Sequence, residues 1–127
     1  TAAIYNDLLN EFKQVKEDES IFAFPHIPII YLISNRYPDS KVLVSWFDFL
    51  PDTEAIIEAE RIIKNPPTII AEIIMPDSTW TSHEKLFRNS KPLGQRSIKE
   101  AIRSIVSNND KYQMHIKKNI SIKSYFQ

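Results

Sequence analysis

Apolar residues at helical spacing predict five helices along the chain. An amphipathic helix is expected over residues 4–17, where apolar residues recur every three to four positions between polar ones. A short helix is expected over residues 27–34, because Pro28 falls in its first turn, where the missing N–H of proline is harmless. A second short helix is expected over residues 82–88.

The two remaining helices have clearer signals at their starts. Asp52 precedes one of them as an acceptor for its first free N–H groups. Its expected apolar face is formed by Ile56, Ala59, Ile62 and Ile63. Ser97 and Glu100 form a capping box at the start of the last helix, and apolar residues follow at helical spacing from Ile98.

Runs of β-branched and aromatic residues predict the strands. Residues 20–24 form a short apolar run that Pro25 ends, and residues 41–47 form a second run between turn-forming residues. Residues 68–75 are almost continuously apolar, as a strand covered on both faces must be, and we expect them at the centre of the sheet. From residue 112 to Phe126, alternating residues on either side of a turn at 118–119 predict a C-terminal hairpin.

Strands that alternate with helices indicate the α/β class. We expect residues 1–127 to form a single layered domain, with a mixed, mainly parallel sheet flanked by helices and the hairpin at an antiparallel edge. Glu72 interrupts the apolar strand, so it requires either water at a sheet edge or a basic partner. The candidate partners are Arg36, Arg61 and Arg88.

The composition excludes several classes of protein. The 127 residues include no cysteine, which removes disulfides, thiolate metal sites and cysteine nucleophiles. Gly94 is the only glycine, so the chain lacks the glycine-rich loops that hold nucleotide phosphates. Sixteen basic and sixteen acidic residues cancel, and no net field favours nucleic acid. We therefore expect no nucleic-acid partner and no cofactor, and the wide spacing of the three histidines indicates no metal site.

Candidate ligand-binding residues follow the expected strands, because ligands of open α/β sheets bind beyond the carboxyl ends of the strands. They are His26, Asp48, Asp77, Trp80, His83 and Glu84. Asp48 with His83 or Glu84 would form an acid–base pair if the side chains came within about 3 Å. The sequence alone identifies no catalytic residue.

These residues also have structural interpretations. The aspartates flank prolines and helix starts, where capping and turn formation account for them. His26 lies between two prolines and fits a turn residue or a half-buried ring. Four aromatic residues fit either core anchors, a sugar-stacking set or an exposed interaction patch: Trp46, Phe47, Phe49 and Trp80.

Three segments resemble a known family. They are Phe24-Pro25-His26-Ile27-Pro28-Ile29-Ile30-Tyr31-Leu32-Ile33-Ser34-Asn35-Arg36-Tyr37-Pro38, Trp46-Phe47-Asp48-Phe49-Leu50-Pro51 and Asn65-Pro66-Pro67. They are similar to the soluble C-terminal domain that follows the membrane helices of polyprenyl-phosphate-sugar-dependent glycosyltransferases, of the dolichyl-phosphate-mannose protein mannosyltransferase-like type. The resemblance covers residues 20–75.

The resemblance implies a fragment of a longer membrane protein, on the extracytoplasmic (periplasmic) side of a bacterial inner membrane. A start at Thr1 agrees with this, and residues 1–19 would connect to an upstream transmembrane region. The family's catalytic acids lie between membrane helices, so this domain would be accessory and non-catalytic and would assist the acceptor or the lipid-linked donor. The implied ligands are a glycan or a polyprenyl-phosphate sugar, with Tyr31, Arg36 and Asp48 as motif positions.

Two other functions stay open. One is a self-standing α/β enzyme built around Asp48, His83 and Glu84. The other is a ligand-binding or protein-interaction module that uses the aromatic residues.

Overall fold

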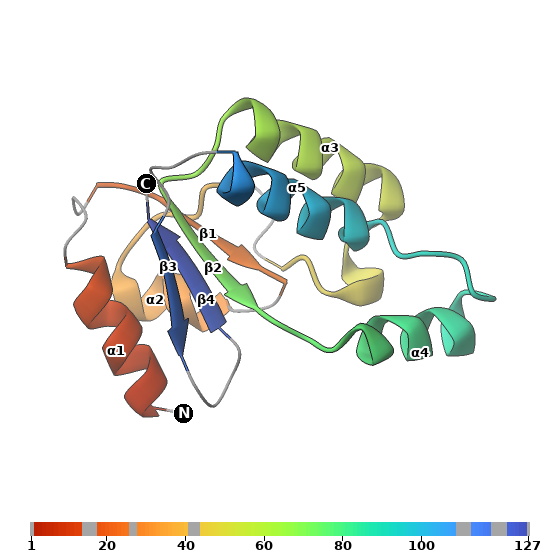
Figure 1. Ribbon diagram of the computed structural model, residues 1–127, viewed down its shortest axis with the longest axis horizontal. Helices are drawn as coiled ribbons and strands as arrows, with labels where there is room; N and C mark the ends of the chain where they lie inside the picture. Colours follow the sequence, from red (N-terminus) through yellow and green to blue (C-terminus); the bar gives the residue numbers. More distant parts are fainter. Residues whose placement is uncertain are drawn as a thin grey trace.

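The described part of the chain forms a sheet of four strands in the order β1-β2-β4-β3 (Figure 1). The structure is a computed structural model that describes residues 2–13, 18–25, 28–40, 44–108, 113–117 and 122–126. The strands are β1 (Ile21–Phe24), β2 (Ile69–Ile73), β3 (Gln113–Lys117) and β4 (Ile122–Phe126). β1 and β2 are parallel, whereas β4 is antiparallel to both β2 and β3.

Five α-helices accompany these strands in the described part of the chain. They are α1 (Ala2–Phe12), α2 (Pro28–Ser34), α3 (Asp52–Lys64), α4 (Asp77–Phe87) and α5 (Gln95–Ser107). The chain therefore has the mixed helix and strand content of the α/β class. None of the described helices is long and apolar enough to cross a membrane.

The prediction of a strand over residues 41–47 is wrong for residues 44–47, which are the part of it that the structure describes. Residues 44–46 have no regular secondary structure, and a 3-10 turn, η1 (Phe47–Phe49), follows them. Within η1, Asp48 has a φ of 33°, which no strand residue adopts. One of the three pairings among the described strands is parallel, so the expected mainly parallel sheet is not found. Residues 41–43 and the turn expected at 118–119 lie outside the described residues.

The two faces of β1 and β2 pack against different helices, because side chains alternate along a strand. Phe22, Phe24 and Ile70 belong to one apolar cluster with residues of α3 and α5. Ile21, Ala23, Ile69 and Ala71 belong to a second cluster with Phe12 of α1 and Ile30 of α2. Figure 1 shows α3 and α5 side by side along one side of the strands. The continuous apolar sequence of β2 is explained by this burial on both faces.

The outer edge of β1 is covered, which satisfies backbone groups that an edge strand leaves unpaired. The N–H of Ile21 donates to the carbonyl of Tyr37 at 3.0 Å, and the N–H of Asp39 donates back to the carbonyl of Ile21 at 2.8 Å. The next outward N–H, that of Ala23, donates to the hydroxyl of Tyr31 at 3.1 Å. α2 and the segment that follows it therefore close this edge of the sheet.

α3 buries a different face from the one that the sequence predicts. Ala59 and Ile62 are buried as expected, but Ile56 and Ile63 are 46% and 53% exposed. Glu58 is buried instead, because both of its oxygens accept hydrogen bonds from Arg61, each at 2.9 Å.

Helix starts also differ from the sequence prediction. α5 begins at Gln95, two residues before the expected capping box, and no side chain caps it. Ser97 lies inside the first turn, where its N–H donates to the carbonyl of Gly94. Likewise, α3 begins with Asp52 as a helical residue after Pro51, so Asp52 is not its cap. Asp52 does not cap the helix because its side chain accepts hydrogen bonds from a distant segment, the α4–α5 connection.

Candidate functional site

A cleft of about 240 Å³ lies at the carboxyl end of β2, where α/β sheets bind ligands. We call it the β2-end cleft. It is lined by Glu72, Ile73, Ile74, Met75, Asp77, Trp80, Lys99 and Arg103. The first six come from β2, the connection after it and the start of α4, and the last two come from α5. Two of the predicted ligand-binding residues, Asp77 and Trp80, are therefore part of one cleft.

Trp80 is only 2% exposed and acts as a core anchor at the inner side of this cleft. Its ring packs against Phe24 and Phe47, with ring centroids 6.2 and 4.9 Å apart. The Nζ of Lys99 and the guanidinium carbon of Arg96 lie 5.3 and 5.6 Å from its centroid, within the range of cation–π contacts. These neighbours leave the ring no face for stacking on a sugar. The indole Nε1 is buried and has no hydrogen-bond partner among the described residues.

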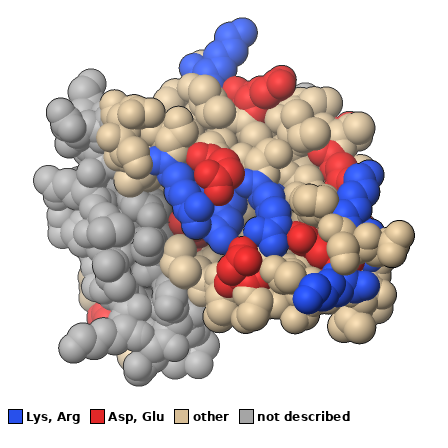
Figure 2. Space-filling model, turned by 45° about the vertical axis from the view of Figure 1, so that its right-hand side comes forward, with Lys and Arg blue, Asp and Glu red and all other residues tan. Residues whose placement is uncertain are grey.

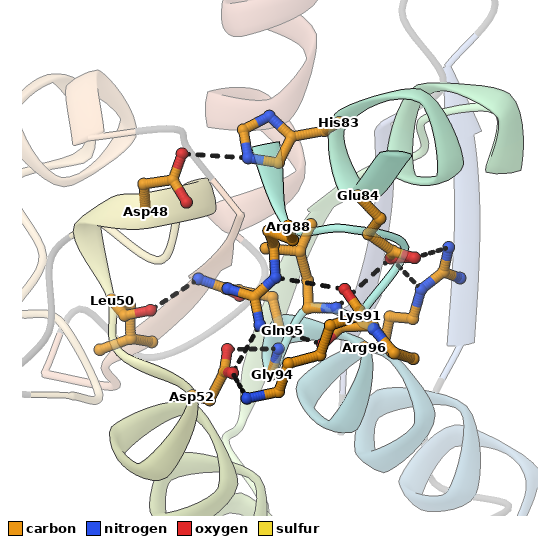
Figure 3. A network of polar contacts seen from close by, with 12 residues as sticks. Asp48, Leu50, Asp52, His83, Glu84, Arg88, Lys91, Gly94, Gln95 and Arg96 are labelled. Carbon is orange, nitrogen blue, oxygen red and sulfur yellow. Dashed lines mark hydrogen bonds and ion pairs between the residues drawn. The ribbon is translucent and has the colours of Figure 1, made fainter. Parts of the chain in front are cut away.

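Arg96 connects two of the predicted ligand-binding residues, Asp77 and Glu84, which both lie on α4 because this helix begins at Asp77, five residues before the expected start. Its Nη1 lies 2.9 Å from Oδ1 of Asp77. Its Nε and Nη2 donate to the carboxylate of Glu84 (Figure 3). Glu84 is buried, and Oε1 also accepts from the N–H of Leu93. Asp77 is exposed, and the hydrogen bond from Arg96 lowers the pKa of its carboxyl. Glu84 is thus a structural anchor between α4 and α5, and not an acid–base group.

Asp48 lies next to His83, which is one of the two acid–base pairings that the sequence left open. Oδ2 of Asp48 lies 3.0 Å from Nε2 of His83, although the contact lacks the geometry of a hydrogen bond (Figure 3). The His83 ring lies between Phe47 and Phe87, with centroids 4.6 and 4.9 Å away. Asp48 is 61% exposed, and neither side chain lines the β2-end cleft. Asp48 is therefore exposed to water, whereas the His83 side chain is 17% exposed and its Nε2 is buried.

A second polar network attaches the start of α3 to the α4–α5 connection. Asp52 accepts hydrogen bonds from Nη2 of Arg88 at 2.5 Å and from the N–H of Gly94 at 2.9 Å, and Nζ of Lys91 lies 3.5 Å away (Figure 3). The hydrogen bond from Arg88 lowers the pKa of Asp52. Gln95, which is fully buried, donates to the carbonyls of Trp46 and Leu50. These contacts hold η1 and α3 against the connection and are structural.

The remaining motif residues lie elsewhere in the fold. Besides accepting from β1, the Tyr31 hydroxyl is largely buried, and this burial raises its pKa to about 12. Arg36 is buried and donates to the carbonyls of Phe12 and Glu19, which caps the end of α1. His26 lies outside the described residues. Tyr31 and Arg36 thus serve the packing of α1 and α2 and do not join the β2-end cleft.

The four aromatic residues do not form a common exposed patch. Phe47 and Trp80 are buried, and Trp46 is half-buried and stacks on Phe47 with centroids 4.7 Å apart. Phe49 alone among them is exposed, at 76%. The core-anchor interpretation therefore fits three of the four residues.

Lys99 and Arg103 are the cleft residues that sequence reasoning missed. Their spacing of four residues on a predicted helix places them on one face, which the sequence does show. What the sequence does not show is that this face meets the end of β2.

Two of the arginines that the sequence offered as partners of Glu72 bond to other carboxylates. Arg61 bonds to Glu58 and Asp39, and Arg88 bonds to Asp52.

Basic and acidic side chains alternate on the side of the molecule where α4 lies, so no large patch of one sign forms there (Figure 2). Among the described residues, no group of three or more potential metal ligands is close enough to hold an ion.

Comparison with known proteins finds no relative: no family model, no curated protein and no solved structure matches the chain. The class that the structure itself defines is a mixed α/β protein with a small, charged cleft at the carboxyl end of β2.

Proposed function

We propose that this chain is a non-catalytic, ligand-binding accessory domain whose site is the β2-end cleft. The observation that carries the proposal is the meeting of Asp77, Trp80, Lys99 and Arg103 in one cleft beyond the end of a parallel strand. Hydrogen-bond donors and acceptors line the cleft together with the apolar Ile73, Ile74 and Met75, a mixture typical of small-molecule sites.

The contacts of the other candidates support binding over catalysis. Glu84 and Asp77 bond to Arg96, Tyr31 accepts from the backbone of β1, and Arg36 caps α1. An enzyme of this size normally places its acid–base groups in a concave site from which water is excluded. Among the described residues that line the cleft, no nucleophile lies beside a base.

The proposed architecture is a single layered domain over residues 1–127. The two apolar clusters on opposite faces of β1 and β2 support helices on both sides of the sheet. The antiparallel pairing of β3 with β4 supports a C-terminal hairpin.

The proposed setting follows from the family resemblance of residues 20–75. In that setting the domain is attached to an upstream transmembrane region, lies on the extracytoplasmic side of a bacterial inner membrane, and assists a membrane-embedded glycosyltransferase. The glycan or polyprenyl-phosphate sugar is then a candidate ligand. Fractionation of source cells followed by an immunoblot tests the setting. A band well above 14.8 kDa that only detergent releases supports it, and a band near 14.8 kDa in the soluble fraction refutes it.

Ligand binding is tested by NMR titration of ¹⁵N-labelled protein with separate panels of neutral sugars, sugar phosphates and amino acids. We expect at least one panel to shift the amide signals of residues 72–80 and 99–103. The matched variants are Lys99→Gln, which removes a charge from the cleft, and Lys85→Gln, which removes an exposed charge from α4. Absence of any shift, or shifts that Lys99→Gln and Lys85→Gln leave equally unchanged, would refute the proposal.

The 3.0 Å approach of Asp48 to His83 favours a second candidate, a self-standing enzyme that uses this pair for proton transfer. Turnover of a sugar donor or an ester by the purified protein, abolished by His83→Gln, would support this candidate. Turnover that His83→Gln leaves unchanged would exclude the pair.

A further inference from the structure

A second concave surface lies between α3 and α5 and shares no lining residue with the β2-end cleft. Its volume is about 460 Å³, and we call it the α3–α5 groove. Ile56, Ala59 and Ile63 of α3 and Ala101 of α5 supply apolar side chains to it. Ile56 and Ile63 are 46% and 53% exposed, so the folded chain leaves large apolar side chains in contact with water in a hollow. Apolar surface of this kind is typical of a binding surface.

The groove has the dimensions of a site for a helix. On α5 its lining extends from Arg96 to Ser104, and a hollow of about 270 Å³ that shares Ser104 continues it to Asn108. From Arg96 to Asn108, a rise of about 1.5 Å per residue gives about 18 Å, or about three helical turns. Ala59 and Ala101 are small, so side chains of a third helix can pack between their larger neighbours.

The charges of the described residues at the groove are mainly negative. Glu60 from α3 and Glu100 from α5 both line it. Glu60 is exposed and pairs with no described side chain, and Glu100 pairs with Arg103, the two side chains being 67% and 61% exposed. Arg96 also lines the groove, but its guanidinium already bonds to two carboxylates of α4. Exposed pairs contribute little to stability, so Glu100 can exchange Arg103 for a cation of a partner.

A second copy of this chain does not match these charges. In a two-fold symmetric dimer, the middle of the contact surface lies against the same residues of the second copy. Glu60 lies between the two exposed isoleucines of α3, and Glu100 lies midway between Arg96 and Ser104. Both carboxylates would therefore meet their own copies, and like charges placed together oppose association. The groove is matched instead by an apolar helix that carries basic side chains along its edges.

We infer that the α3–α5 groove binds an amphipathic helix of another protein. One face of this helix has apolar residues at i, i+3, i+4 and i+7, with lysine or arginine beside them. The apolar residues pack on Ile56, Ile63 and Ala101, and the basic residues pair with Glu60 and Glu100. The inference goes beyond the proposed function and is independent of it, because it concerns a protein partner at a different surface.

The test uses three synthetic peptides of about 15 residues, a length at which alanine-rich peptides begin to form helix in water. All three carry leucine at i, i+3, i+4 and i+7. The positions beside the leucines are lysine in the first peptide, glutamate in the second and glutamine in the third. Each peptide is titrated into ¹⁵N-labelled protein and followed by NMR.

We expect the lysine peptide to shift the amide signals of residues 56–63 and 96–104. The glutamate peptide should bind at least about tenfold more weakly, because two attractive contacts become two repulsive ones. The glutamine peptide should bind with an affinity between the two. Added salt should reduce the difference, because the carboxylates are exposed.

Matched variants locate the contact. Ile63→Ser removes an exposed isoleucine that lines the groove, whereas Ile57→Ser removes one that is 56% exposed on the same helix and does not line it. Ile63→Ser should weaken binding of the lysine peptide at least about fivefold, and Ile57→Ser should leave it unchanged. Glu60→Gln with Glu100→Gln should bring the affinities of the lysine and glutamate peptides within about threefold of each other. Glu54→Gln, an exposed change on α3 outside the groove, should keep them apart.

Each outcome supports or overturns the inference, once circular dichroism has verified that the variants fold. Binding of the lysine peptide that Ile63→Ser weakens and Ile57→Ser does not supports it. Absence of binding overturns it, as do shifts that both variants leave equally unchanged and equal binding of the lysine and glutamate peptides. Sedimentation velocity tests the other occupant: a wild-type dimer that Ile63→Ser dissociates would place a second copy in the groove and overturn the inference.

Discussion

Replacing Gly94 by alanine tests the contact between the start of α3 and the α4–α5 connection. Gly94 has a φ of −59° and a ψ of −29°, an ordinary helical conformation that alanine adopts without strain. In an open environment this substitution would stabilise the protein by about 0.4–1 kcal/mol, because alanine has fewer conformations to lose on folding. The backbone conformation alone therefore predicts stabilisation.

The surroundings of Gly94 predict the opposite sign. A Cβ atom there would lie 2.5 Å from the Cα of Asp52 and 2.9 Å from its carbonyl oxygen, and both of these are backbone atoms that no rotamer change can move. Relieving the clash moves Asp52 away from the N–H of Gly94 and from Arg88. Overpacking of this kind costs about 1–3 kcal/mol, and a weakened hydrogen bond adds about 1 kcal/mol. We expect a total loss of about 2–4 kcal/mol.

Urea unfolding followed by circular dichroism measures this difference directly. For a chain of 127 residues, an unfolding entropy of about 2.1 cal/mol/K per residue converts 3 kcal/mol into a fall in Tm of about 11 °C. Ser97→Ala in the same first turn of α5 is the matched control, with an expected change within about 0.5 kcal/mol. A Gly94→Ala protein that is as stable as the wild type, or more stable, would refute the close approach of the two segments.

Three further predictions concern the core and the buried polar groups. Tyr31→Phe should cost about 1–3 kcal/mol because it leaves an N–H of β1 without its acceptor. In the wild type, the raised Tyr31 pKa means that the folded state keeps its proton longer than the unfolded state; stability should therefore fall between pH 10 and 12, and pH-dependent urea unfolding should show a smaller fall in Tyr31→Phe. Ile62→Ala should cost about 2–5 kcal/mol and Ile57→Ala less than about 1 kcal/mol, because Ile62 is fully buried and Ile57 is 56% exposed; equal losses in thermal melts would contradict the burial pattern of α3. Arg96→Met should cost about 2–4 kcal/mol by leaving the Glu84 carboxylate buried without its cation, and adding Glu84→Gln should recover part of the loss; additive losses in this double-mutant cycle would contradict the pairing.

Local sequence signals were sufficient to predict those elements whose apolar residues follow the period of a strand or a helix. The continuous apolar run of β2 and the apolar spacing in α5 predicted a strand and a helix that the structure contains. Such patterns work because the periods of strand and helix are properties of the backbone. They also predicted the existence of α1, α2 and α3, although the starts and ends differ by a few residues.

Other local signals were overridden by contacts between distant segments. The aromatic run up to Phe47 has strand-like composition, yet Phe47 turns its ring against Trp80 and the chain passes into η1. Aspartate is a residue type that commonly caps helices, yet the Asp52 carboxylate accepts a hydrogen bond from Arg88, which is 36 residues away. In both cases the energy of a tertiary contact exceeds the weak local preference.

The candidate site shows the same division. The sequence by itself determined that Asp77 and Trp80 follow an apolar strand, which made them candidate ligand-binding residues, and that Lys99 and Arg103 share one helical face. Only the tertiary structure decided that these four meet in a cleft, that Glu84 is buried in an ion pair, and that Asp48 and His83 lie outside the cleft. The physical reason is that spacing along the chain sets the direction of side chains within one helix or strand, whereas the approach of one element to another depends on how all the apolar faces pack together.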